Sequence, residues 1–102
     1  MKEIKAIVQP HVLDRVLDAM HRLEGVPEMT ISETRIHGAG RRRFEPEVRW
    51  KIEIVVPDER VAEVVATIRT QARTGNPGDG GVFVIPVEQV VAIRGDDAPH
   101  AP

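Results

Sequence analysis

The sequence predicts an α+β fold in which two helices cover one face of an antiparallel sheet. Two segments with helical spacing of apolar residues lie between segments in which apolar residues alternate or run together. The chain has 15 Val and 9 Ile but only 3 Leu, and this excess of β-branched residues favours strands. At 102 residues it has the length of one ordinary domain.

Composition excludes several classes of protein. The formal net charge of −2 and the pI of about 6.1 are not those of a general nucleic-acid-binding protein. Without cysteine, the chain has no disulfide, no thiol nucleophile and no cysteine-ligated zinc. No apolar run approaches the roughly 18 residues of a membrane span, and the N-terminus lacks the apolar segment of a signal peptide. We therefore expect a soluble, cytoplasmic protein.

The first predicted strand and helix occupy the N-terminal quarter of the chain. Residues 2–9 alternate as a strand does, and Pro10 suits the first turn of a helix. Gly25 and Pro27 then end the helix. Its apolar stripe consists of Leu13, Val16, Leu17, Met20 and Leu23.

Two strands and a polar loop follow. Residues 29–37 predict a strand. Ile31 is odd-numbered and Ile36 even-numbered, so they would face opposite sides of a regular strand, which indicates a bulge or bend. The loop 38–47 opens with glycines and carries arginines. Residues 48–56 alternate most clearly and predict a strand with one apolar face.

The second helix begins after Pro57, with Asp58 as its expected N-cap. Residues 82–87 predict a buried strand and residues 90–94 an additional one. The apolar stripe of this helix consists of Val61, Val64, Val65 and Ile68.

The order of elements is therefore β-α-β-β-α-β with an extra C-terminal strand. This order is that of a ferredoxin-like sandwich. We expect one domain over residues 1–95 and a flexible tail over residues 96–102, because the tail has no apolar periodicity. The fold alone does not indicate an activity, since many functions share it.

Two glycine-rich loops are the candidate functional segments. In Thr74-Gly75-Asn76-Pro77-Gly78-Asp79-Gly80-Gly81, consecutive N–H groups can form a nest for phosphate oxygens. The alternative is a C-capping turn around Gly75, although such a cap needs only one glycine. In Gly38-Ala39-Gly40-Arg41-Arg42-Arg43, the arginines are suited to phosphate, or else they belong to a solvated hairpin loop. The four histidines lack metal-ligand spacing, and only His37 keeps a metal option open.

Five segments together resemble the P-II nitrogen-regulatory family over nearly the whole chain. They are MKEIKAIVQPHVLDRVLDAM at the start, GAGR at 38–41, KIEIVVPDE at 51–59, ARTGNPGDGGVFV at 72–84 and AIRGDD at 92–97. The resemblance implies a homotrimer that binds adenine nucleotides as effectors in clefts between neighbouring subunits. It implies no obligatory cofactor and no catalytic residue.

The resemblance also implies roles for individual residues. Ile7 and Val55 would line the adenine pocket with Glu53 beside it, and a hydroxyl from Thr30 or Ser32 would face the base. The phosphates would be contacted from above by Gly38, Gly40 and Arg41. They would be contacted from the neighbouring subunit's side by the loop that contains Gly75, Gly78, Asp79, Gly80 and Gly81, and by Arg94.

The sequence departs from the family pattern at several of these positions. The partner-binding loop is short, and the chain has no tyrosine, so uridylylation on that loop is impossible. Arg42 replaces the glutamine that helps to hold Mg-ATP and 2-oxoglutarate. Gly81 and Ala92 replace two cations that contact phosphates, for which Arg42, Arg43 and Arg49 are the candidate substitutes. Because each charge-assisted contact contributes about 1.5–3 kcal/mol, we expect ADP or AMP to be preferred over ATP.

We therefore interpret the chain as a non-enzymatic, nucleotide-responsive regulator of a membrane transporter or an enzyme. A small anion such as bicarbonate would sit near Arg41, Arg42 and Arg43 as a second ligand. The alternative is a trimeric metal- or small-ligand-binding protein like the CutA family, or one linked to metal efflux. An acylphosphatase-like enzyme would need an arginine between the first strand and helix, where Gln9-Pro10-His11 has none.

Overall fold

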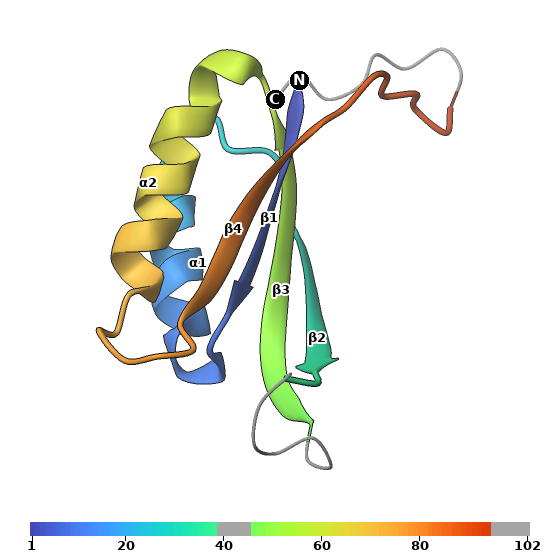
Figure 1. The fold of residues 1–102 in the computed structure, drawn as a ribbon. Coiled ribbons are helices and arrows are strands. Elements are labelled where there is room, and N and C mark those ends of the chain that lie inside the picture. The colour runs from blue at the N-terminus through green and yellow to red at the C-terminus, as the bar shows by residue number, and fades with distance from the viewer. Residues whose placement is uncertain (39–45, 95–102) are drawn as a thin grey trace.

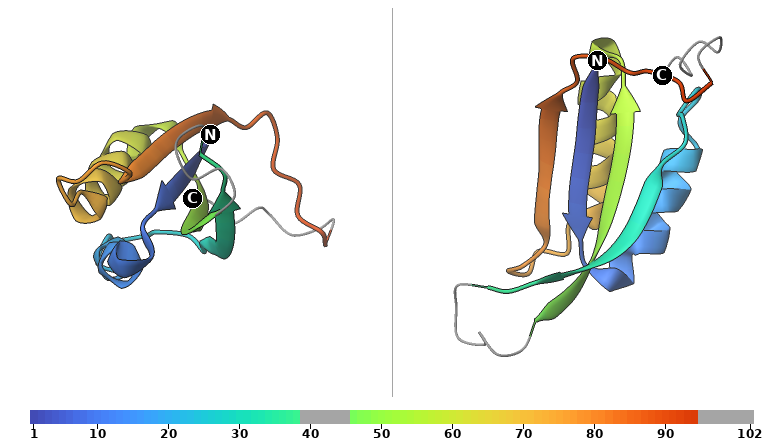
Figure 2. Two further views of the ribbon diagram at one scale, coloured as in Figure 1. Left: turned by 60° about the horizontal axis from the view of Figure 1, so that its bottom comes forward. Right: turned by 90° about the vertical axis from the view of Figure 1, so that its right-hand side faces the viewer.

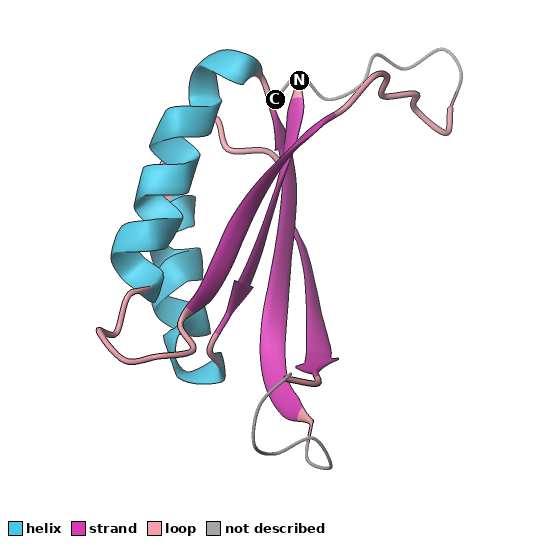
Figure 3. Cartoon of the chain, viewed as in Figure 1, coloured by secondary structure: helices cyan, strands magenta, loops and turns pink. Residues whose placement is uncertain are grey.

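The computed structural model describes residues 1–38 and 46–94, and it has the predicted α+β architecture (Figures 1 and 3). The elements follow one another as β1 (Lys2–Val8), α1 (Leu13–His21), β2 (Thr30–Ile36), β3 (Glu47–Val56), α2 (Val61–Ala72) and β4 (Gly80–Pro86). Short 3₁₀ turns over Pro10–Val12 and Asp58–Arg60 precede the two helices. The sheet has the order β2-β3-β1-β4, and every neighbouring pair is antiparallel. Both helices cover the same face (Figure 2).

The core lies between the helices and one face of the two central strands. Alternation places the side chains of even-numbered residues of β1 and β3 on this face, because successive residues of a strand point to opposite sides. The core residues that are at most 2 % exposed are Ile4, Ala6, Val8, Ile52, Ile54 and Val56 of the sheet and Val12, Val16, Met20, Val64 and Ile68 of the helical segments. The other face of the sheet has no helix over it (Figure 2).

Of the bulge or bend predicted in the second strand, the bulge is absent. Residues Thr30 to Ile36 pair with Glu53 to Glu47 without a break in register. Ile31 lies opposite the buried Ile52 and packs against the core, whereas Ile36 lies on the opposite face. The two isoleucines need not share a face, because β2 is an edge strand and its hairpin with β3 extends beyond the helices (Figure 2).

Asp58 does not cap the second helix, contrary to prediction. Its carboxylate instead accepts a hydrogen bond from the N-terminal amine of Met1 at 2.8 Å and lies 3.6 Å from the ammonium of Lys2. The hydrogen bond from the N-terminal amine is the main cause that lowers the pKa of Asp58 below its ordinary value of 3.8. The turn before α2 is closed by the backbone instead, where Arg60 N donates to the carbonyl of Pro57.

The C-terminal strands also differ from prediction. β4 is not buried, because it is an edge strand with a neighbour on one side only, and Phe83 and Val84 are about half exposed. Residues 90–94 form no strand, since the chain leaves the sheet after Val87 and has no strand beside it there (Figure 1). The predicted tail 96–102 lies outside the described residues. In the ranges that the structure describes, neither helix has the length and apolarity needed to cross a bilayer.

Candidate functional site

The glycine loop between α2 and β4 is the most constrained segment of the described chain. The helix ends at Ala72, and Arg73 is already extended, with φ −71° and ψ 126°. Gly75 comes three residues after the end of the helix, so it is not the C-capping residue that the alternative interpretation required. The φ angles of Gly75, Gly78 and Gly80 are between +86° and +98°, a region that glycine adopts without strain.

Asp79 closes the loop on itself. Its Oδ2 accepts hydrogen bonds from the backbone N–H of Thr74 at 2.9 Å and of Gly75 at 3.3 Å, and its Oδ1 accepts one from the Thr74 hydroxyl. The Thr74 hydroxyl oxygen in turn accepts a hydrogen bond from the N–H of Asn76 at 3.1 Å. The hydrogen bonds from Thr74, first from its hydroxyl and then from its N–H, lower the pKa of Asp79 below 3.8.

These bonds change the predicted phosphate nest. The first N–H groups of the loop point at a carboxylate of the chain itself and not at an external anion. Across the described residues, the N–H groups of Gly78 and Asp79 donate to no other group. An external anion would therefore meet only the donors in the C-terminal half of the loop, which are fewer than the N–H groups of the whole loop.

Gly80 fixes the loop against the central strand. A Cβ atom at this position would lie 1.8 Å from the carbonyl oxygen of Ile7, so no other residue fits there without movement of the main chain. At Gly78 a Cβ would lie 3.4 Å from Gln9 Nε2 and 3.6 Å from Arg49 Nη2. The loop is thus in contact with the end of β1 and with β3.

Gln9 holds the loop from the side of the sheet, and Arg49 lies beside it. Gln9 Nε2 donates to the carbonyl of Gly78 at 2.6 Å. Arg49 is only 6 % exposed, and its guanidinium donates to Glu47 at 2.6 Å and to the carbonyl of Val48 at 2.9 Å. The sequence named Arg49 as a candidate substitute for the missing phosphate-binding cations, and it missed Gln9, whose position directly after a strand gave no signal of this contact.

The residues expected around the adenine lie on the open face of the sheet. Strand pairing produces two rows across this face, each of which contains predicted site residues. One row consists of Ser32, Lys51, Ile7 and Gly81, and the next consists of Thr30, Glu53, Lys5 and Phe83. Lys5 Nζ lies 5.5 Å from the centre of the Phe83 ring, and Lys51 lies 3.8 Å from Glu53. Val55 is on the same face, opposite Glu3.

Among the described residues, Arg94 is not brought to this place within one chain. Gly38 follows the end of β2, while Gly40, Arg41, Arg42 and Arg43 lie outside the described residues. The segment that ends at Arg94 leaves the sheet at the end of β4 opposite the glycine loop (Figures 1 and 2). His37 is exposed, and the described ranges contain no group of three residues able to hold a metal.

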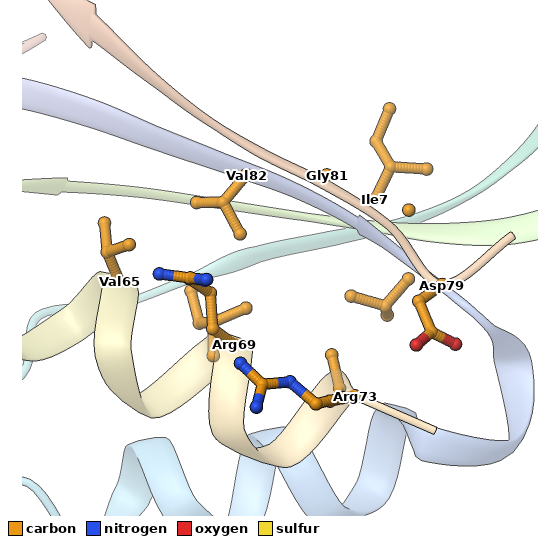
Figure 4. Close-up of a pocket in the computed structure, with 11 residues that line it drawn as sticks. Ile7, Val65, Arg69, Arg73, Asp79, Gly81 and Val82 are labelled. Atoms are coloured by element: carbon orange, nitrogen blue, oxygen red, sulfur yellow. The ribbon is translucent and has the colours of Figure 1, made fainter. Parts of the chain in front are cut away.

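A groove of about 320 Å³ adjoins the glycine loop on the helix side of the sheet (Figure 4). It lies between α2 and the start of β4, and Asp79 and Gly80 form the part of its rim that belongs to the loop. Arg69 and Arg73 of α2 also line it. The sequence reasoning did not single out these arginines, although their spacing of four residues on one helix was a visible signal.

Comparison with known proteins decides the family. The family model described as "Nitrogen regulatory protein P-II" matches residues 1–97. The chain belongs to the P-II family. P-II proteins from Azospirillum brasilense and Microchaete diplosiphon are 38 % and 42 % identical to it, and the protein named P-II 1 of Escherichia coli K12 is 40 % identical. Each alignment covers 92 % of this chain and 92 % of the relative.

Membership of the P-II family confirms the resemblance found in the sequence. The family consists of regulatory signalling proteins and not of enzymes, in agreement with the sequence interpretation. The α+β fold with two helices on a four-stranded antiparallel sheet is also the fold expected of a P-II protein.

The contact between Gly80 and Ile7 makes a first prediction. Gly80→Ala should lower the free energy of unfolding by about 2–4 kcal/mol, because the new Cβ meets main-chain atoms and the φ angle is positive. Gly75→Ala is the matched control, since its φ is also positive but nothing lies within 4 Å of the new Cβ. It should cost only about 1–2 kcal/mol. Urea unfolding followed by Trp50 fluorescence at fixed protein concentration measures both, and equal losses would contradict the steric argument.

Asp79→Asn makes a second prediction, on pH dependence. The folded state lowers the pKa of Asp79, so the stabilisation is present above the ordinary pKa of 3.8 and is lost as pH falls through the folded value. The variant should be less stable than the parent at neutral pH, and the difference should shrink as the pH falls below 3.8. The lowered pKa of Asp58 is common to both proteins and cancels in the comparison. A difference that is constant over this pH range would show that the loop does not depend on the ionised carboxylate.

Proposed function

We propose that this P-II protein binds an adenine nucleotide between two copies of the chain and uses it to control a partner protein. The observation that carries the proposal is the glycine loop, which is held by Gly80 against Ile7 and so lies beside the open face of the sheet. The loop offers free N–H groups at Gly78 and Asp79, and the open face offers the apolar side chain of Ile7 next to it. The phosphate of a nucleotide would therefore lie at the loop, and its base would lie beside it on the open face.

The base would rest on the open face. Ile7 and Val55 supply apolar contact there, and Thr30 lies directly opposite Glu53 across the β2–β3 pair. A hydroxyl and a carboxylate side by side can accept hydrogen bonds from an exocyclic amine, and the hydroxyl can also donate to a ring nitrogen. This combination suits adenine.

The need for a second copy follows from the place of Arg94. The segment that carries it lies at the far end of β4 from the glycine loop, so one chain does not bring both to the same phosphate (Figure 1). The family resemblance assigns Arg94 to a cleft between subunits. We therefore propose a homotrimer in the cytoplasm, with a membrane transporter or an enzyme as its regulated partner.

Residues 39–45, which would cover the nucleotide and reach that partner, lie outside the described residues. The same holds for a second small ligand such as bicarbonate at Arg41, Arg42 and Arg43.

The phosphate side favours a short nucleotide. Gly81 and Ala92 provide no positive charge for the outer phosphates. Arg49 lies beside the loop, but its guanidinium is already paired with Glu47. The site thus has less positive charge for a γ-phosphate than the family pattern provides, and the preference for ADP or AMP over ATP follows from this.

Titration calorimetry of the full chain with ATP, ADP and AMP tests the proposal. We expect ADP or AMP to bind more tightly than ATP, and Glu53→Gln to weaken binding of either by about tenfold through loss of the charged acceptor. Glu33→Gln is the control, because Glu33 is an exposed glutamate of the neighbouring strand β2 that faces the other side of the sheet. Tighter binding of ATP would overturn the preference, and absence of all nucleotide binding would overturn the function. Light scattering at the same concentration tests the trimer.

A further inference from the structure

The groove beside α2 adjoins the face on which the nucleotide would lie, and its lining includes Ile7, Asp79, Gly80 and Gly81 of the predicted nucleotide site. Its floor is aliphatic: Val65 and Val82 are partly exposed, whereas Val8, Ile68 and Ala72 behind them are buried. In Figure 4 the side chain of Ile7 points to the opposite side of the strands from Val82 and Arg69. The groove thus opens on the helix side of β4, whereas Thr30, Glu53 and Val55 of the predicted adenine residues lie on the other side of the sheet.

Two arginines give this groove a positive rim. Arg69 and Arg73 are four residues apart on α2, so they lie on one side of the helix, and both line the groove. Neither guanidinium forms an ion pair in the described part of the chain, whereas Arg35, Arg49 and Arg60 each pair with a glutamate.

The carboxylate at the rim does not neutralise this charge. Asp79 also lines the groove, but its two oxygens accept the hydrogen bonds of Thr74 and Gly75. In Figure 4 Asp79 lies across the groove from the guanidinium groups of Arg69 and Arg73. An apolar floor with two unpaired cations on one side is therefore what a ligand would meet.

We propose that this groove binds a small organic carboxylate with a short, branched aliphatic body. Its volume of about 320 Å³ lies at the lower end of the range of small-molecule sites, which fits a ligand of a few carbon atoms. Guanidinium groups match the planar fork of a carboxylate, and the partly exposed Val65 and Val82 give apolar contact to a branched chain. Inorganic phosphate has no part that would use the floor.

The inference does not rest on nucleotide binding, and its test uses no nucleotide. Full-length chain labelled with ¹⁵N is titrated with isovalerate, with acetate, with the neutral isostere isovaleramide and with inorganic phosphate. We expect isovalerate to shift the amide signals of residues 68–73 and 80–82 and to saturate with a Kd in the millimolar range, because the arginines are exposed to solvent. Acetate and phosphate should bind at least about tenfold more weakly, and isovaleramide should not saturate.

Substitutions of the two rim arginines then test whether they bind the carboxylate. Arg69→Gln and Arg73→Gln should each weaken isovalerate binding by about fivefold. Arg22→Gln is the matched control, since Arg22 is an exposed arginine after α1, outside the groove. An equal affinity for isovaleramide would overturn the role of the charge, and an equal affinity for acetate or phosphate would overturn the role of the floor. Absence of shifts at these amides would overturn the site, whatever calorimetry shows for nucleotides.

Discussion

The contact of Gly80 with the carbonyl of Ile7 determines where the glycine loop lies, and most of what the protein offers to a ligand depends on it. β1 is a central strand with β3 on one side and β4 on the other, and it contributes Ile4, Ala6 and Val8 to the core. A loop that rests directly on this strand takes its position from the most buried part of the sheet. Because Gly80 has no side chain, the glycine loop can lie directly against β1, a strand of the core.

Asp79 and Thr74 keep the loop in one shape once Gly80 has fixed its end. Asp79 holds the N-terminal half of the loop through its carboxylate, and Gln9 holds the carbonyl of Gly78 from the strand side. The donors that remain, at Gly78 and Asp79, are presented without any bond that a ligand would first have to break. Such preorganisation would lower the entropic cost of binding the proposed nucleotide, because the loop would not have to be ordered by it.

Local pattern was enough to predict most of the fold. Strands β1 and β3 and both helices follow from alternation and helical spacing, because burial on one face imposes these periods on the sequence. The errors occur where a partner distant in the sequence decides the outcome. Asp58 has the composition of an N-cap, but the N-terminal amine of Met1, 57 residues away, takes its carboxylate. Ile36 suggested a bulge only on the assumption that every apolar residue of an edge strand must face the core.

In the candidate site, too, the local sequence pattern predicted some features, whereas contacts between distant residues determined the others. The glycines of the loop were evident in the sequence, since their number exceeds what a capping turn needs. The internal use of the loop donors by Asp79 was not, because no residue pattern distinguishes an aspartate that binds its own loop from one that faces a ligand. Gln9, Arg69 and Arg73 acquire their roles from the meeting of β1, α2 and the loop, which only the tertiary structure shows.

β4 differs from the other strands in one respect that concerns the behaviour of the single chain. It contains no charged residue, whereas the opposite edge strand β2 contains Glu33 and Arg35. Lysines, glutamates and arginines on an edge discourage pairing with foreign strands, and β4 has none of them between Gly80 and Pro86. A freshly synthesised chain therefore exposes a sheet edge open to aggregation until another surface covers it.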